Sequence, residues 1–227
     1  MNRIPYDYSG FRLSRLREPR FHHLLYLLGW VGYFILYFLT ENLIPAESCH
    51  VMHCALDDMI PFCEYFLVFY CFWYVFVFGS LLYYLVYDVQ SFTKLQTFII
   101  ATQVIAMAVY IIYPSRQDMR PDVFVRDNAF THLMAFIYSF DTSTGVCPSL
   151  HVGYSLGIAS VFLKNKNAPK VWKGITVFLV IMISLSTAFV KQHSMVDVFW
   201  ALPLGVAAEA ITYGKDYWLP KLRKNKG

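Results

Sequence analysis

Two short stretches of this chain carry residues whose types and spacing suit catalysis. The first is Cys147–His151, with the sequence CPSLH, and the second combines Lys191–His193, with the sequence KQH, and Asp197. His193 and Asp197 are four residues apart, so on a helix their side chains share a face and can touch. A carboxylate beside an imidazole fixes its tautomer and stabilises its cation, which makes the histidine a nucleophile or a base.

The first stretch predicts an anion site at the start of a helix. Proline suits the first helical position because its missing N–H would be unpaired there, so we expect a helix to begin at Pro148. The free N–H groups and the positive dipole end of the first turn then favour an anion. Ser149 adds a hydroxyl donor, and His151 stands in the same turn. An anion site beside two histidines, one oriented by a carboxylate, indicates phosphoryl chemistry.

The composition indicates that a membrane protein positions these stretches. The chain has 227 residues, of which 57% are hydrophobic and only 15% charged, against roughly 45–50% apolar residues in soluble domains. We expect one all-α membrane domain over residues 24–213, between a basic N-terminal segment, 1–23, and a basic tail, 214–227. Among the five cysteines, Cys49 and Cys54 allow a bridge if their loop faces an oxidising space, which is the less favoured alternative.

Six apolar runs predict six transmembrane helices. Their expected bounds are Leu24–Thr40, Phe62–Val86, Leu95–Tyr113, Pro148–Leu163, Ile175–Val190 and Ser194–Tyr213. The longest loop, 114–146, contains an apolar piece, 129–140, that we expect at the membrane interface or re-entering the protein.

The distribution of cations orients these spans. An even number of spans puts both termini on one side, and only Arg116, Arg120, Arg126 and Lys191, among the 19 Lys and Arg residues, fall on the other. The positive-inside rule therefore predicts cytoplasmic termini. Spans four and six then begin at the outer face, which brings His151 and His193 to the same side. Alone, either histidine could be structural; this shared side favours the catalytic interpretation.

The residues of these two stretches, together with part of the long loop, resemble a known family, the type 2 phosphatidic acid phosphatase superfamily. Its motifs are K-x6-R-P, P-S-G-H and S-R-x5-H-x3-D. Here they read Tyr113-x6-Arg120-Pro121, then Pro148-Ser149-Leu150-His151, then Ser186-Thr187-x5-His193-x3-Asp197. The departures are Tyr113, Leu150 and Thr187. A lysine just before the last histidine is similar to the branch of inositol phosphorylceramide synthases.

The resemblance implies a role for each residue. His193 would attack phosphorus to form a phosphohistidine, Asp197 would orient it, and His151 would protonate the leaving oxygen. The residues implied to hold the phosphate oxygens are Arg120, Ser149, Lys191 and, for the absent lysine, Arg116. Lys191 would replace the arginine missing at Thr187 if residues 187–191 continue the fifth helix. No metal or other cofactor is expected, because cations take the electrostatic role.

The sequence therefore predicts a plasma-membrane phosphoesterase with its site on the non-cytoplasmic face. Its substrate would be a lipid phosphate or diphosphate presented by the bilayer, with no nucleic-acid partner. Two alternatives stay open. An alcohol could replace water, giving a lipid phosphotransferase, or the chain could be an inactive relative that binds lipid head groups. The oligomeric state is not predicted.

Overall fold

The structure, a computed structural model, describes residues 4–224 of the chain. Arg3 and Lys226, two of the basic residues of the terminal segments, lie outside this range. The elements in chain order are η1 (Leu13–Arg15), η2 (His22–Leu27), α1 (Leu28–Leu43), η3 (Ala46–Ser48), β1 (His50–Val51), α2 (Ala55–Met59), η4 (Glu64–Phe66), α3 (Leu67–Tyr87), α4 (Val89–Ile112), β2 (Ser115–Arg116), α5 (Ala129–Phe140), α6 (Leu150–Lys164), α7 (Lys170–Phe189), α8 (Met195–Tyr213), η5 (Gly214–Trp218) and α9 (Leu219–Lys224). The predicted all-α class is confirmed.

Five helices in the described range are long and apolar enough to cross a membrane. Their bounds, including adjoining turns, are His22–Leu43, Glu64–Tyr87, Val89–Ile112, Lys170–Phe189 and Met195–Lys224. They correspond to the first, second, third, fifth and sixth predicted spans and are compatible with an integral membrane protein. The fourth predicted span forms α6, whose 15 residues extend about 22 Å at roughly 1.5 Å per residue. This is less than a hydrocarbon core of about 30 Å, so six complete crossings stay a prediction.

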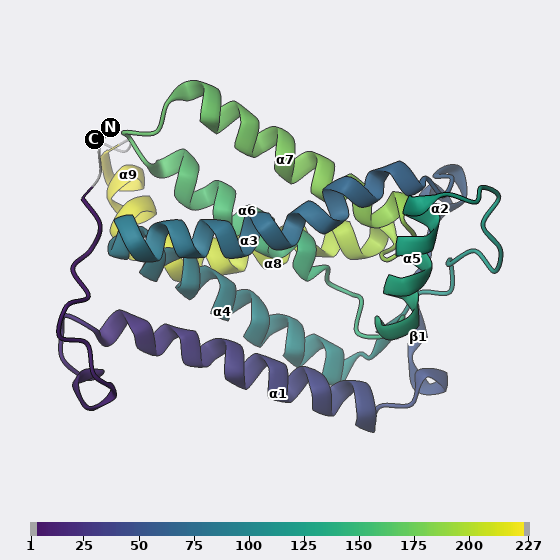
Figure 1. The fold of residues 1–227 in the computed structure, drawn as a ribbon, viewed down its shortest axis with the longest axis horizontal. Helices are drawn as coiled ribbons and strands as arrows, with labels where there is room; N and C mark the ends of the chain where they lie inside the picture. The colour runs from purple at the N-terminus through teal and green to yellow at the C-terminus, as the bar shows by residue number, and fades with distance from the viewer. Residues whose placement is uncertain (1–3, 225–227) are drawn as a thin grey trace.

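The short helix α6 forms the centre of the bundle, where it packs against α3, α4, α7 and α8 (Figure 1). Glycine permits this close packing at two points. A Cβ atom on Gly157 would lie 2.7 Å from Cδ1 of Phe98, and one on Gly205 would lie 2.8 Å from Cδ1 of Leu156. Because α6 is enclosed on several sides, its first turn is held firmly against the helices that surround it.

The two ends of the bundle differ in structure. At one end lie both terminal segments, where the Tyr6 N–H donates to the Val86 carbonyl at 2.6 Å and Lys94 pairs with Asp216 at 3.0 Å. The strands, α2 and α5 lie at the other end (Figure 1). There β1 pairs in parallel with β2, with His50 opposite Ser115, so the segment after α1 is joined to the segment after α4.

The apolar piece of the longest loop forms α5 at the strand end of the bundle (Figure 1). Met134 and Ile137 of α5 are buried in one apolar cluster with Leu67, Tyr70 and Val190. The helix is thus anchored on α3 and on the turn that follows α7. Its last residue directly precedes Asp141, so the packing of α5 fixes where that carboxylate lies.

Candidate active site

His193 and Asp197 are in contact, but they do not share a helix. Helix α7 ends at Phe189, and α8 begins at Met195 after Ser194, so His193 lies in the turn between the helices. Asp197 is in the first turn of α8, where Oδ2 accepts from the Ser194 N–H at 2.9 Å and lies 3.2 Å from Nδ1 of His193. The predicted contact between the two side chains is present. It forms because Asp197 caps the first turn of α8, not because the two residues share the face of one helix.

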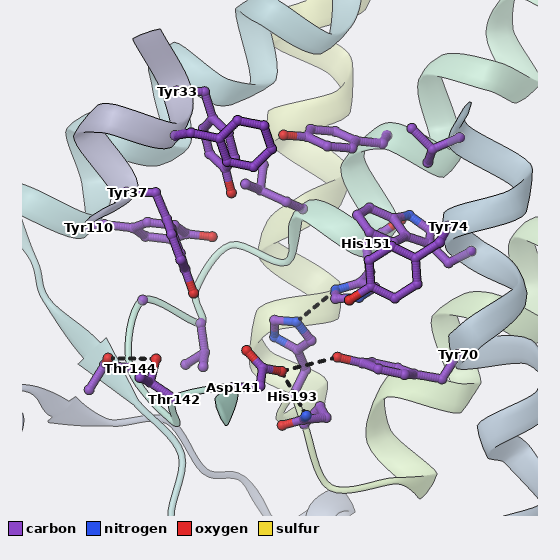
Figure 2. A pocket seen from close by; sticks show the side chains of 18 of the residues that line it. Tyr33, Tyr37, Tyr70, Tyr74, Tyr110, Asp141, Thr142, Thr144, His151 and His193 are labelled. Carbon is purple, nitrogen blue, oxygen red and sulfur yellow. Dashed lines mark hydrogen bonds between the residues drawn. The ribbon is translucent and has the colours of Figure 1, made fainter. Parts of the chain in front are cut away.

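His151 completes a line of three side chains with His193 and Asp197, and Figure 2 shows the two histidines of this line. Its Nδ1 lies 3.4 Å from Nε2 of His193, a long hydrogen-bond contact. The ring of His151 is held by aromatic rings of α3, with ring centroids 4.8 Å from Tyr70 and 4.2 Å from Trp73. Asp197 and His151 therefore flank His193 on opposite nitrogens. The sequence had predicted only that the two histidines lie at the same end of the bundle.

The start of α6 differs from the prediction. The helix begins at Leu150, not at Pro148, because Ser149 has an extended backbone with φ −68° and ψ 118°. The Ser149 N–H donates to the Asp197 carbonyl at 3.1 Å, and the Tyr110 hydroxyl donates to the Pro148 carbonyl at 2.8 Å. These bonds hold the segment outside the helix and tie it to α8. The Ser149 hydroxyl is buried and has no partner among the described residues.

Lys191 points away from the histidines. The premise that residues 187–191 continue a helix is wrong, since α7 ends at Phe189 and Lys191 has the left-handed φ of 52°. Its ammonium donates to the carbonyls of Asp57 at 2.9 Å and Ile60 at 2.6 Å. Thr187 is fully buried. Lys191 therefore does not replace an arginine at position 187 in this structure.

The two predicted arginine ligands are also engaged elsewhere. Arg120 donates to the carbonyls of Asp141 at 2.8 Å and Thr142 at 2.9 Å, and to Oε1 of Gln192 at 2.6 Å. Arg116 donates to the Ala46 carbonyl at 3.1 Å and pairs with Asp118 at 3.1 Å. The structure brings together His151, His193 and Asp197, with Ser149 beside them, but not the three cations.

A cavity of about 260 Å³ adjoins the two histidines. Among residues 4–224, its lining contains no Lys or Arg. Its walls are mainly aromatic, and its polar lining consists chiefly of His151, His193, Asp141, Gln192, Thr142 and Thr144. Phe34 of α1 and Phe78 of α3 line it and are each 55% exposed. The cavity therefore reaches the surface of the bundle between α1 and α3.

Asp141 and Gln192 are site residues that the sequence reasoning missed. Oδ2 of Asp141 accepts from Nε2 of Gln192 at 2.8 Å and from the Tyr70 hydroxyl at 3.4 Å (Figure 2). Burial raises the pKa of Asp141, and the opposing effect of Arg120 and His193 does not cancel it. The sequence signal that could have identified Gln192 as a site residue was its place next to His193. The signal for Asp141 was weaker, namely that it is the acidic residue directly after the apolar piece of the long loop.

The sequence analysis also did not assign the aromatic residues of α1 and α3 to the site. Tyr33 and Tyr37 are four residues apart on α1, and Tyr70, Trp73 and Tyr74 follow helical spacing on α3. The sequence favoured lipid-facing packing for such residues. Helical spacing was the available signal. It indicates that the aromatic residues of each helix lie on one face of that helix, and both of these faces line the cavity.

Two charged groups beneath the site fix the turn that carries His193. Burial lowers the pKa of Lys191, and the neighbouring carboxylates of Asp57 and Asp58 only partly oppose this effect. Burial acts to raise the pKa of Asp57, but hydrogen bonds from the Ser194 hydroxyl and from backbone N–H groups outweigh it and hold the pKa below its ordinary value. Asp57 is thus kept as a buried carboxylate.

Within the described range, no group of three or more His, Cys, Asp or Glu side chains is placed to hold a metal ion. All five cysteines are free thiols, so Cys49 and Cys54 are not bridged. Comparisons of the chain with protein-family models, with curated proteins and with solved structures found no match.

Proposed function

We propose that this chain is an integral membrane enzyme that cleaves a phosphate ester of a lipid through a phosphohistidine on His193. The observation that carries the proposal is the line of Asp197, His193 and His151, with contacts of 3.2 Å and 3.4 Å, in which the two histidines line a cavity. That cavity reaches the surface between two long apolar helices, which suits a substrate held in a bilayer.

In the first half of the reaction, Asp197 accepts a hydrogen bond from Nδ1 of His193. This tautomer leaves the Nε2 lone pair free to attack phosphorus. The Nε2–phosphorus bond forms as the bond from phosphorus to the lipid oxygen breaks, and His151 gives its proton to that oxygen. Such general acid catalysis contributes about 10²- to 10⁴-fold. The 3.4 Å contact between the histidines opens as the phosphoryl group enters from the cavity.

In the second half, His151 takes a proton from the incoming nucleophile. Water then attacks phosphorus, the Nε2–phosphorus bond breaks, and the phosphate product leaves. An alcohol in place of water makes the same chain a phosphotransferase. The Ser149 hydroxyl, buried without a described partner, and the free N–H groups of the first turn of α6 supply donors to the phosphate oxygens. Arg120, Arg116 and Lys191 act at a distance, because other groups hold them.

We place the site on the non-cytoplasmic face of the plasma membrane. Support comes from the sequence, where only four of the 19 Lys and Arg residues fall on the predicted outer side. The described terminal segments lie at the end of the bundle opposite the strands and α5 (Figure 1), which suits an even number of crossings.

The test is product analysis with the purified protein in vesicles. Phosphatidate, an isoprenoid diphosphate and neutral phospholipids are each supplied, with and without an acceptor alcohol. We expect a phosphorus-containing product from at least one lipid and an acid-labile phosphoprotein intermediate. Both should be lost in His193→Ala and retained in His132→Ala, whose histidine is 74% exposed on α5. Turnover that persists in His193→Ala would overturn the mechanism. Binding of a lipid without any turnover would instead support the alternative that the chain is an inactive protein that binds lipid head groups.

A further inference from the structure

The charges around the cavity restrict the kind of phosphate that it can accept. Asp141 lines it, and Glu41 lies directly behind its edge, where it accepts from Thr144 Oγ1 at 3.0 Å and contacts Thr142. Among the described residues, no Lys or Arg lines the cavity. Arg120 donates to backbone carbonyls and to Gln192, Lys191 donates to backbone carbonyls, and Arg126 pairs with Glu64 at 3.0 Å. A dianionic phosphate monoester would therefore meet carboxylates and no lysine or arginine.

The walls of the same cavity suit a cation instead. Tyr33 and Tyr37 of α1 and Tyr110 of α4 lie on one side, and Tyr70 and Tyr74 of α3 lie on the other (Figure 2). Aromatic rings attract a cation within about 6 Å of the ring centre, and quaternary ammonium groups are commonly bound this way. Asp141 lies at the foot of these walls, beside His193 (Figure 2), and supplies the opposite charge.

The size and mouth of the cavity fix how a lipid would lie. Its volume of about 260 Å³ is slightly below the roughly 300–1,000 Å³ usual for sites that enclose a drug-sized ligand. It therefore holds a head group, while acyl chains stay outside between α1 and α3. A phosphate at Nε2 of His193 would then place a head-group ammonium, a few bonds away, between Asp141 and the aromatic walls.

We propose that the cavity selects a zwitterionic phosphodiester lipid whose head group ends in an alkylated ammonium ion, as in a choline phospholipid. This inference rests on the proposed function, because it names the substrate class of the same site. The phosphodiester carries one negative charge, which the ammonium balances inside the head group. In the reaction, the Nε2–phosphorus bond forms and the phosphorus–oxygen bond to the lipid alcohol breaks, with His151 protonating that oxygen. Water then releases the phosphorylated amino alcohol and restores His193.

Binding and turnover are measured separately to test this. Binding to the His193→Ala protein is followed by tryptophan fluorescence, since Trp30 and Trp73 line the cavity, with phosphocholine, tetramethylammonium and inorganic phosphate as probes. We expect the first two to bind and phosphate alone to bind at least tenfold more weakly. Turnover is measured on vesicles that contain a choline phospholipid, phosphatidate or phosphatidylglycerol. The readout is the water-soluble product of each lipid, which is phosphocholine, inorganic phosphate or glycerol phosphate, respectively.

Four variants separate the contributions of charge and of the aromatic rings. Asp141→Asn should weaken phosphocholine binding about tenfold or more, whereas Asp118→Asn, a half-exposed carboxylate paired with Arg116, should not. Tyr37→Leu should weaken it and Tyr37→Phe should retain it, because a ring face, not a hydroxyl, attracts the cation.

The outcomes distinguish this inference from the proposed function. Cleavage of phosphatidate but not of the choline phospholipid overturns the inference and leaves the phosphohistidine enzyme standing. Phosphocholine binding that needs Asp141, without turnover of any lipid, supports the cation site and overturns the enzyme. Equal binding of phosphate and phosphocholine, unchanged in Asp141→Asn, overturns the inference.

Discussion

Lys191 donates from its ammonium to the backbone carbonyl of Asp57 at 2.9 Å, while the Asp57 carboxylate accepts from residues just beyond Lys191. Those donors are the Ser194 hydroxyl at 2.5 Å and the Met195 N–H at 2.8 Å. The two residues thus fasten α2 to the turn between α7 and α8. His193 stands in that turn, so its position depends on a contact far away in the sequence.

Removal of Asp57 should therefore loosen the site. Asp57→Ala leaves buried donors without an acceptor, and a hydrogen bond to a charged group contributes about 1.5–3 kcal/mol. We expect a free energy of unfolding in detergent lower by about that amount, together with reduced activity. Asp58→Ala is the matched control. That carboxylate also acts on Lys191 through its charge, but it is 70% exposed, and its ion pair in the described contacts is with His53 and not with the turn. Equal effects of the two changes would contradict this role.

The contact of Lys191 also predicts the result of a double substitution. Lys191→Ala should lower stability, because it leaves the Asp57 and Ile60 carbonyls without their donor. Adding Thr187→Arg should lower it further, since position 187 is fully buried and a charge is costly there. Rescue of activity by Thr187→Arg would instead return Lys191 to the phosphate site. Melting curves and rates of the four proteins decide between these results.

The role of His151 predicts a dependence on the leaving group. An acid is needed most when the departing oxygen is strongly basic. His151→Ala should slow cleavage of an alkyl phosphate ester by about 10²-fold or more and an activated aryl ester much less. A uniform loss on both esters, measured as kcat/KM, would make His151 a structural neighbour of His193.

Asp141 predicts opposite effects of pH on binding and on stability. Burial raises its pKa, so the carboxyl stays protonated to a higher pH than usual. Binding of a head-group ammonium needs the ionised form, and affinity should rise as the pH rises through that pKa. The folded state binds the proton more tightly than the unfolded state, so this group's contribution to stability falls over the same window. In Asp141→Asn both dependences should disappear from titrations of binding and of melting temperature.

Labelling of introduced cysteines tests the orientation. Ser115 is fully buried, but Val125 of the same loop is completely exposed, so Val125→Cys is the better probe. In a background without the native cysteines, it should react with an impermeant thiol reagent in intact cells. Asn167→Cys, in the exposed connection between α6 and α7, should react only after permeabilisation. The reverse pattern would move the site to the cytoplasmic side.

The sequence predicted the helices well, because long apolar runs have few other structures open to them. It also predicted that His151 and His193 lie at the same end of the bundle, because each stands near the start of a helix that runs in the same direction; the contact between them comes from the structure. The contacts of the cationic side chains could not be predicted in the same way. Lys191 depends on where α7 ends, and an end one or two residues earlier turns its side chain from the cavity toward α2.

The aromatic cavity could not be predicted from the sequence for a different reason. Hydropathy does not distinguish a tyrosine that faces lipid from one that faces a cavity, because both lie on apolar helices. Tyr33 and Tyr70 share the cavity only because α1 and α3 both pack on α4. Asp141 depends in turn on the packing of α5, which carries it to the foot of the walls.

For the proposed reaction, the opening between α1 and α3, edged by Phe34 and Phe78, predicts which concentration sets the rate. A lipid that arrives sideways is supplied by diffusion in two dimensions, so its surface density, rather than its amount per volume of buffer, sets the occupancy of the cavity. Diluting reconstituted vesicles with buffer should leave the turnover rate per protein unchanged. Diluting the substrate with an inert lipid in the same vesicles should lower the rate in proportion until the cavity is no longer saturated.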